Sequence, residues 1–124
     1  MEKSYFWTMS FLVLHQIDAA FWREWEMFLL PGGIQGYLAF NAVAIPILLL
    51  GYKHVVAASE NAVFFAKLCA ALGALTFFIH AGFALAGFGQ FHLPVSVSLI
   101  VLCFIGALWL AVEIKRSGRG HQYA

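Results

Sequence analysis

The chain has 124 residues, of which 63% are hydrophobic and 10% are charged, and its formal net charge is +1. Soluble domains average about 45–50% apolar and about 25% charged residues, so both figures indicate a membrane protein. The composition also argues against a disordered chain, the two cysteines argue against a disulfide scaffold, and the nearly neutral charge argues against nucleic acid as a partner.

Long segments without charge define the predicted helices, since residues 27–52 and residues 68–112 contain no Asp, Glu, Lys or Arg. A membrane helix needs about 20 mostly apolar residues, so the first segment holds one helix and the second holds two. The segments lack the alternation of a membrane barrel. Together with the apolar N-terminal segment, they predict an all-α membrane fold. It is a single-domain bundle of four transmembrane helices, at about 5–22, 34–52, 63–88 and 94–114.

The N-terminal segment has two features that affect its interpretation. His15, Gln16 and Asp18 occupy the place of a small-residue cleavage site, which favours a retained first helix over a signal peptide. Residues 22–30 contain two Trp residues around their charges. They either extend the first helix outward or lie along the membrane interface as a lid, and periodicity does not separate these two interpretations.

Basic residues predict the orientation of the bundle. Four spans place both termini and the loop between the second and third spans on one side of the membrane. Arg23 lies on the other side, and all other basic residues lie on the first side. The positive-inside rule then predicts that both termini are cytoplasmic. The residues on the first side are Lys3, Lys53, Lys67, Lys115, Arg116 and Arg119.

Each predicted span carries one polar or soft side chain at a similar depth, about 10–14 Å below the outer boundary at 1.5 Å per residue. These residues are His15, Asn41, His80 and Cys103. Helical phase places Asp18 and Glu26 on the same stripe of the first helix as His15, and it places Glu24 on the opposite side. We therefore expect His15 and His80 to point toward each other inside the bundle.

The polar residues near the outer face form a candidate metal site. Two imidazoles and one or two carboxylates suit a divalent transition metal such as Zn²⁺, Fe²⁺ or Mn²⁺ and leave positions for water or oxygen. An ionisable residue within a membrane is a functional candidate by default. The predicted ligands are His15, Asp18 and His80, with Glu26 and His92 as outer partners. The pattern indicates no particular reaction and leaves open whether the protein is an enzyme.

Other interpretations of the same residues remain open. His15 and His80 also suit the axial positions of a b-type haem. A purely structural alternative pairs His15 with Asp18 by a hydrogen bond and satisfies His80 through Thr76 or a backbone carbonyl. A third alternative is a non-catalytic membrane subunit, either in a homo-oligomer or bound to a larger membrane partner, because most of this chain contacts lipid.

One motif resembles a known family. The stretch from His15 to Phe28 reads HQIDAAFWREWEMF, and Leu30-Pro31-Gly32-Gly33 follows it. It resembles a family of small uncharacterised bacterial integral membrane proteins with four spans. The resemblance implies a protein of the bacterial inner membrane, and it assigns no activity, substrate or cofactor.

Overall fold

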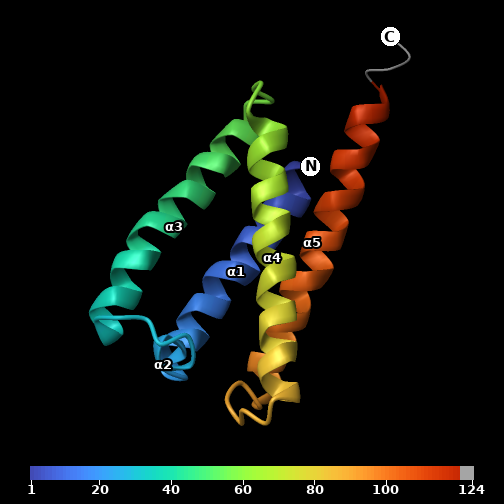
Figure 1. Cartoon of the computed structure of the whole chain (residues 1–124). Helices are drawn as coiled ribbons and strands as arrows, with labels where there is room; N and C mark the ends of the chain where they lie inside the picture. The colour runs from blue at the N-terminus through green and yellow to red at the C-terminus, as the bar shows by residue number, and fades with distance from the viewer. Residues whose placement is uncertain (121–124) are drawn as a thin grey trace.

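The computed structural model describes residues 1–120, and these form five helices (Figure 1). Each predicted span coincides for most of its length with a helix, and α2 lies between the first two. No strand occurs among residues 1–120. The helices are α1 (Glu2–Phe21), α2 (Glu24–Met27), α3 (Gly33–Val56), α4 (Ala62–Leu85) and α5 (Pro94–Gly120).

Three of these helices, α3, α4 and α5, are long and apolar enough to cross a membrane, so the predicted count of four spans is not supported. The difference lies in α1, which has the length of a span but contains His15, Gln16 and Asp18 among its apolar residues. These side chains lower the mean hydropathy of α1. Much of its polar character faces the interior of the bundle, since Ser4, Thr8 and His15 are all buried.

Figure 1 shows α1, α4 and α5 running side by side, while α3 leans away from α4 toward the end where α2 lies. The N-terminus, the α3–α4 connection and the end of α5 lie at one end of the molecule. The α2 helix and the α4–α5 connection lie at the opposite end.

Small residues hold α1, α4 and α5 close together. A Cβ atom added to Gly73 of α4 would lie 2.7 Å from the backbone oxygen of Cys103 in α5. A Cβ atom added to Gly106 of α5 would lie 2.7 Å from the hydroxyl of Thr8 in α1. Membrane helices use such small residues to bring their backbones into contact. These contacts fix the three-helix core against which α3 is placed.

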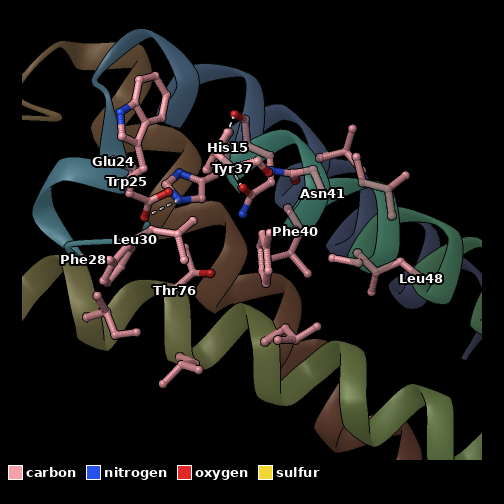
Figure 2. Close-up of a pocket in the computed structure, with 18 of the residues that line it drawn as sticks. His15, Glu24, Trp25, Phe28, Leu30, Tyr37, Phe40, Asn41, Leu48 and Thr76 are labelled. Carbon is pink, nitrogen blue, oxygen red and sulfur yellow. Dashed lines mark hydrogen bonds and ion pairs between the residues drawn. The ribbon is translucent and has the colours of Figure 1, made fainter. Parts of the chain in front are cut away.

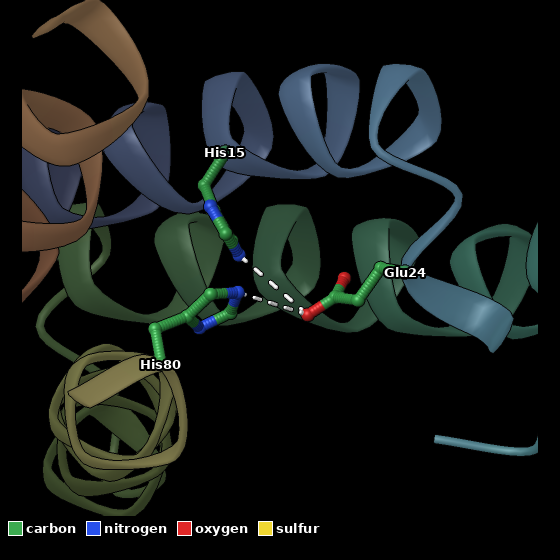
Figure 3. Close-up of side chains that lie close together, drawn as sticks. All are labelled: His15, Glu24 and His80. Atoms are coloured by element: carbon green, nitrogen blue, oxygen red, sulfur yellow. Dashed lines mark ion pairs between the residues drawn. The ribbon is translucent and has the colours of Figure 1, made fainter. Parts of the chain in front are cut away.

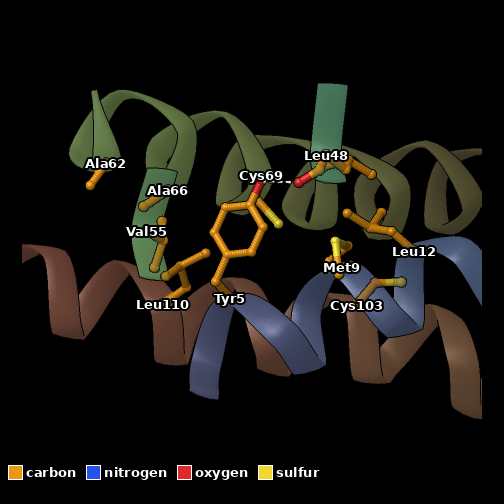
Figure 4. Close-up of a cluster of buried hydrophobic side chains, with 10 residues drawn as sticks. All are labelled: Tyr5, Met9, Leu12, Leu48, Val55, Ala62, Ala66, Cys69, Cys103 and Leu110. Atoms are coloured by element: carbon orange, nitrogen blue, oxygen red, sulfur yellow. Dashed lines mark hydrogen bonds between the residues drawn. The ribbon is translucent and has the colours of Figure 1, made fainter. Parts of the chain in front are cut away.

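A buried apolar cluster joins α3 to this core (Figure 4). At its centre, the Tyr5 hydroxyl of α1 donates a hydrogen bond of 2.9 Å to the backbone carbonyl of Leu48 in α3. The cluster therefore fixes the C-terminal part of α3, beyond Pro46, against α1 and α4. Its buried members are Tyr5, Met9, Leu12, Leu48, Val55, Ala62, Ala66, Cys69, Cys103 and Leu110.

Candidate metal centre

A reversal of the chain after α1 positions the one buried carboxylate of α2. Arg23 has a left-handed backbone conformation, with φ of 56°, between the end of α1 and the start of α2. The prediction that Glu24 points away from His15 is therefore wrong, because it assumed an uninterrupted helix. The turn at Arg23 directs Glu24 back toward the bundle, where it is 5% exposed. Residues 24–27 form a short separate helix, not an extension of α1.

Glu24 meets two histidines from different helices (Figure 3). Its Oε1 lies 3.3 Å from Nε2 of His80 in α4 and 3.9 Å from Nε2 of His15 in α1. The two imidazole rings contact each other edge to face, with centroids 4.7 Å apart. His15 is 1% exposed and His80 is 7% exposed. The predicted convergence of the two histidines is therefore confirmed, although the carboxylate that faces them is not a predicted one.

The hydrogen bond made by Nδ1 of His80 sets the protonation of Nε2, the ring nitrogen that faces Glu24. Nδ1 of His80 lies 2.8 Å from the backbone oxygen of Thr76. A carbonyl oxygen only accepts hydrogen bonds, so Nδ1 carries a proton. In the neutral ring, Nε2 then presents a lone pair to the Glu24 carboxylate, and this buried Nε2 has no hydrogen-bond partner. Two acceptors facing each other require a cation between them, either a proton or a metal ion.

The spacing of the three side chains fits one metal ion. Ligand atoms of His15, Glu24 and His80 all lie within 4.8 Å of one another. Tetrahedral zinc with bonds of about 2.0–2.1 Å keeps its ligand atoms about 3.4 Å apart. The 3.3 Å separation between His80 and Glu24 matches this spacing, and the 3.9 Å separation between His15 and Glu24 is about 0.5 Å longer. The bond from His80 to a backbone carbonyl is also typical of metal-binding histidines.

The contact between the two rings bears on the haem alternative. A haem with two axial histidines lies between their rings, with the iron bound to one nitrogen of each. The rings of His15 and His80 are in direct edge contact, with centroids 4.7 Å apart, so they leave no room for a macrocycle. This geometry favours a single ion over haem.

Asp18, a predicted ligand, lies on a different side of α1 from this group. Its Oδ1 accepts a 2.9 Å hydrogen bond from the hydroxyl of Ser96 in α5, and Trp22 donates a 3.1 Å bond to the same hydroxyl. Asp18 therefore links α1 to α5, and the hydrogen bond to His15 that the structural alternative assumed is not formed. Positions three apart on a helix diverge by about 60°, which is enough to face different neighbours.

Glu26 and His92, the predicted outer partners, also lie outside the group. Glu26 is 54% exposed and forms an ion pair of 2.5 Å with Arg23, three residues earlier. The Nδ1 atom of His92 lies 2.6 Å from the backbone oxygen of Gly89, and its exposed ring packs against Trp22. Both side chains serve local contacts at the surface.

A cavity of about 310 Å³ begins at this group and continues between α1, α3 and α4 (Figure 2). Figure 2 shows Glu24, Trp25 and His15 at one end and Leu48 at the other. The walls are mostly apolar. The lining side chains beyond the polar end include Leu12, Phe40, Ala44, Ile45, Leu48, Leu72, Leu75 and Ile79.

Three further polar side chains line the same end of the cavity. The Tyr37 hydroxyl lies 2.6 Å from Oε1 of Gln16 and 2.8 Å from its backbone oxygen. Nδ2 of Asn41 donates a 3.0 Å hydrogen bond to the backbone oxygen of Tyr37. This bond fixes the orientation of the amide, so Oδ1 of Asn41 is an acceptor, and it is buried without a partner.

Glu24 was not among the predicted ligands, and Asn41 was placed at the same depth as the histidines without a role. The signal for Glu24 was the alternative interpretation of residues 22–30 as a lid, since a lid returns its side chains to the mouth of the bundle. The signal for Asn41 was its depth, which matched that of His15 and His80.

Comparison with known proteins identifies the family of this chain. It belongs to a family of unknown function (DUF6713), whose family model matches residues 1–117. No curated protein and no solved structure matches the chain significantly. Family membership agrees with the expected resemblance to uncharacterised proteins, and it assigns no activity.

Proposed function

We propose that this member of a family of unknown function is a membrane metalloprotein in which His15, Glu24 and His80 bind one divalent transition metal ion. One observation carries the proposal: a buried carboxylate faces two buried imidazoles, one of which turns an unpartnered lone pair toward it. Burying a carboxylate without a cation costs several kcal/mol, and a metal ion removes that cost.

The ligand types favour Zn²⁺ or Fe²⁺. Two histidines and one glutamate occur both in catalytic zinc sites and in non-haem iron oxygenases. With three protein ligands, such an ion supplies Lewis-acid or oxygen chemistry through its remaining positions. The chain contributes the dry setting, since all three ligands are buried and the adjoining cavity is apolar.

The proposed placement has four membrane spans, with α1 as the first. Its inward face is polar, but beyond Lys3 the residues it exposes are apolar, including Leu14, Ile17 and Phe21 at 47%, 66% and 71% exposure. A helix in lipid needs this apolar outer face, and internal contacts accommodate its polar residues. The low mean hydropathy of α1 therefore reflects the site it helps to build.

The proposed orientation has both termini in the cytoplasm and the metal site near the outer face of a bacterial inner membrane. Lys3 at the start of α1, Lys53 near the end of α3 and Lys115 in the last part of α5 lie at one end of the molecule, while Arg23 adjoins α2 at the other end. Single cysteines at Glu26→Cys and Ser117→Cys, in a background without native cysteines, test this. An impermeant maleimide added to intact cells should label only the first, and labelling of only the second would reverse the orientation.

Metal analysis of protein purified in mild detergent tests the proposed site. Wild-type protein from cells supplied with zinc and iron should contain about one metal ion per chain. Glu24→Gln and His80→Ala should lower the metal content at least tenfold, because the first replaces the carboxylate with a neutral amide and the second removes a ligand nitrogen. Glu26→Gln and His92→Ala are the matched controls at the same end of the molecule, and they should retain the metal.

Two results would contradict the proposal. One is folded wild-type protein with only background metal, and the other is equal metal content in Glu24→Gln and Glu26→Gln. Either result favours the alternative of a non-catalytic membrane subunit or homo-oligomeric scaffold, in which Glu24 and His80 form a structural ion pair.

A further inference from the structure

The cavity beside the proposed metal site has the form of a binding site for a chain-like molecule. On α4 its lining residues extend from His80 to Leu72, which is about 12 Å along the helix at 1.5 Å per residue. On α3 they extend from Tyr37 to Leu48, or about 16 Å. Polar side chains line one end and apolar side chains line the rest. A volume of about 310 Å³ is in the lower range of ligand pockets, which start near 300 Å³.

The entrance to the cavity lies on the surface that would contact lipid in the proposed membrane placement. Phe40 of α3 and Leu75 of α4 both line the cavity, yet each is 53% exposed. Phe28, which follows α2, also lines it and is 45% exposed. An opening bordered by exposed apolar side chains from two membrane helices would admit molecules from the bilayer, and this border offers no partner to a charged solute.

The polar end specifies the chemistry of the group that binds there. Asn41 is 9% exposed, and its unpartnered Oδ1 needs a hydrogen-bond donor. A buried acceptor without a donor costs about 1–3 kcal/mol, which a ligand hydroxyl would remove. The hydroxyl oxygen would also suit an open position on the ion held by His15, Glu24 and His80.

We propose that the cavity binds a saturated chain of about ten carbons with a terminal hydroxyl, since an extended chain advances about 1.2 Å per bond. This long-chain alcohol enters from the bilayer between α3 and α4. Its hydroxyl donates to Asn41 and lies beside the metal group. The assignment rests on the proposed metal site for the role of the hydroxyl, while the binding of the chain depends only on the cavity.

The test uses wild-type protein in phosphatidylcholine nanodiscs and a photoreactive 1-decanol with a mid-chain diazirine. Cross-links mapped by mass spectrometry should concentrate on the cavity wall, and excess unlabelled 1-decanol should suppress them. The expected sites are Ala44, Ile45, Leu72 and Leu75. Ala44→Phe fills the cavity and should reduce labelling at least tenfold. Ala39→Phe, on an exposed and non-lining position of α3, should leave it unchanged.

Asn41→Leu tests the hydroxyl and gives a second variant if Ala44→Phe does not fold. Wild-type protein should prefer the alcohol probe about fivefold over a matched decane probe, the contribution of one hydrogen bond, and Asn41→Leu should lose that preference. Labelling confined to outward residues such as Val43, or insensitive to both Ala44→Phe and Asn41→Leu, would overturn the proposal.

Metal content measured on the same samples separates this inference from the proposed function. Cavity labelling that Ala44→Phe abolishes, in protein without metal, would retain the alcohol site and reject the metalloprotein. Metal lost only in Glu24→Gln, together with labelling only at lipid-facing residues, would retain the metal site and reject the alcohol site.

Discussion

Replacing Gly73 with alanine tests the close packing of α1, α4 and α5. The new Cβ atom would lie 2.7 Å from the backbone oxygen of Cys103, 3.2 Å from Cβ of Ala107 and 3.3 Å from Cγ2 of Thr8. The nearest of these is a backbone atom, which does not rotate away. A comfortable carbon–oxygen contact is about 3.3 Å, so α4 and α5 must separate by about 0.6 Å.

The expected cost follows from this displacement. Overpacking a close interface costs about 1–3 kcal/mol. Alanine is also the better helix former by about 0.5–1 kcal/mol, which offsets part of the loss. Gly82→Ala in the same helix isolates the steric contribution, because nothing lies within 4 Å of its added Cβ atom. The difference between the two variants in free energy of unfolding should therefore be about 1–3 kcal/mol, with Gly73→Ala the less stable.

Unfolding of the detergent-solubilised protein by added SDS, followed by circular dichroism, measures this difference. Wild type, Gly73→Ala and Gly82→Ala are compared under identical conditions. Equal midpoints for the two variants, or a less stable Gly82→Ala, would refute the packing described above. The site would then lose its support, since the α1–α4 contact brings His15 to His80.

Further predictions concern the contacts around this core. Tyr5→Phe removes the hydroxyl that donates to Leu48, and it should lower the free energy of unfolding by about 1 kcal/mol in the same assay. Ser96→Ala leaves the Asp18 carboxylate without its donor, and it should cost about 1–3 kcal/mol and shift the fluorescence of Trp22, unlike the control Ser98→Ala, whose hydroxyl is exposed and bonds within its own helix. Glycine adopts the left-handed conformation without strain, so Arg23→Gly should retain both the stability and the metal content of the wild type. Arg23→Val should cost about 1–2 kcal/mol, and unchanged stability in that variant would contradict the reversal.

Part of the candidate site was predictable because it depends on helical periodicity and depth. His15 and His80 occupy equivalent depths on uninterrupted helices, so their meeting follows from antiparallel packing of apolar segments. The contact between their rings confirms that inference. The position of Asn41 was predictable in the same way. It lies at a depth similar to that of His15 and His80, and it lines the same cavity.

The rest of the site depends on breaks in periodicity. Glu24 joins the histidines only because Arg23 adopts a left-handed conformation. Helical periodicity does not predict the direction of a side chain that follows such a turn. Asp18 leaves the group because Ser96 of α5 provides a hydrogen bond on its own side. That contact joins residues 78 positions apart, beyond the reach of any local pattern.

The sequence by itself determined that this protein is helical and apolar, and it located the four long helices, because uncharged segments and 3.6-residue periodicity are local properties of the chain. Tertiary structure alone decided which carboxylate faces His15 and His80 and where the cavity opens. Those outcomes depend on the left-handed turn at Arg23 and on the packing of α3 against distant segments, and periodicity along the chain describes neither.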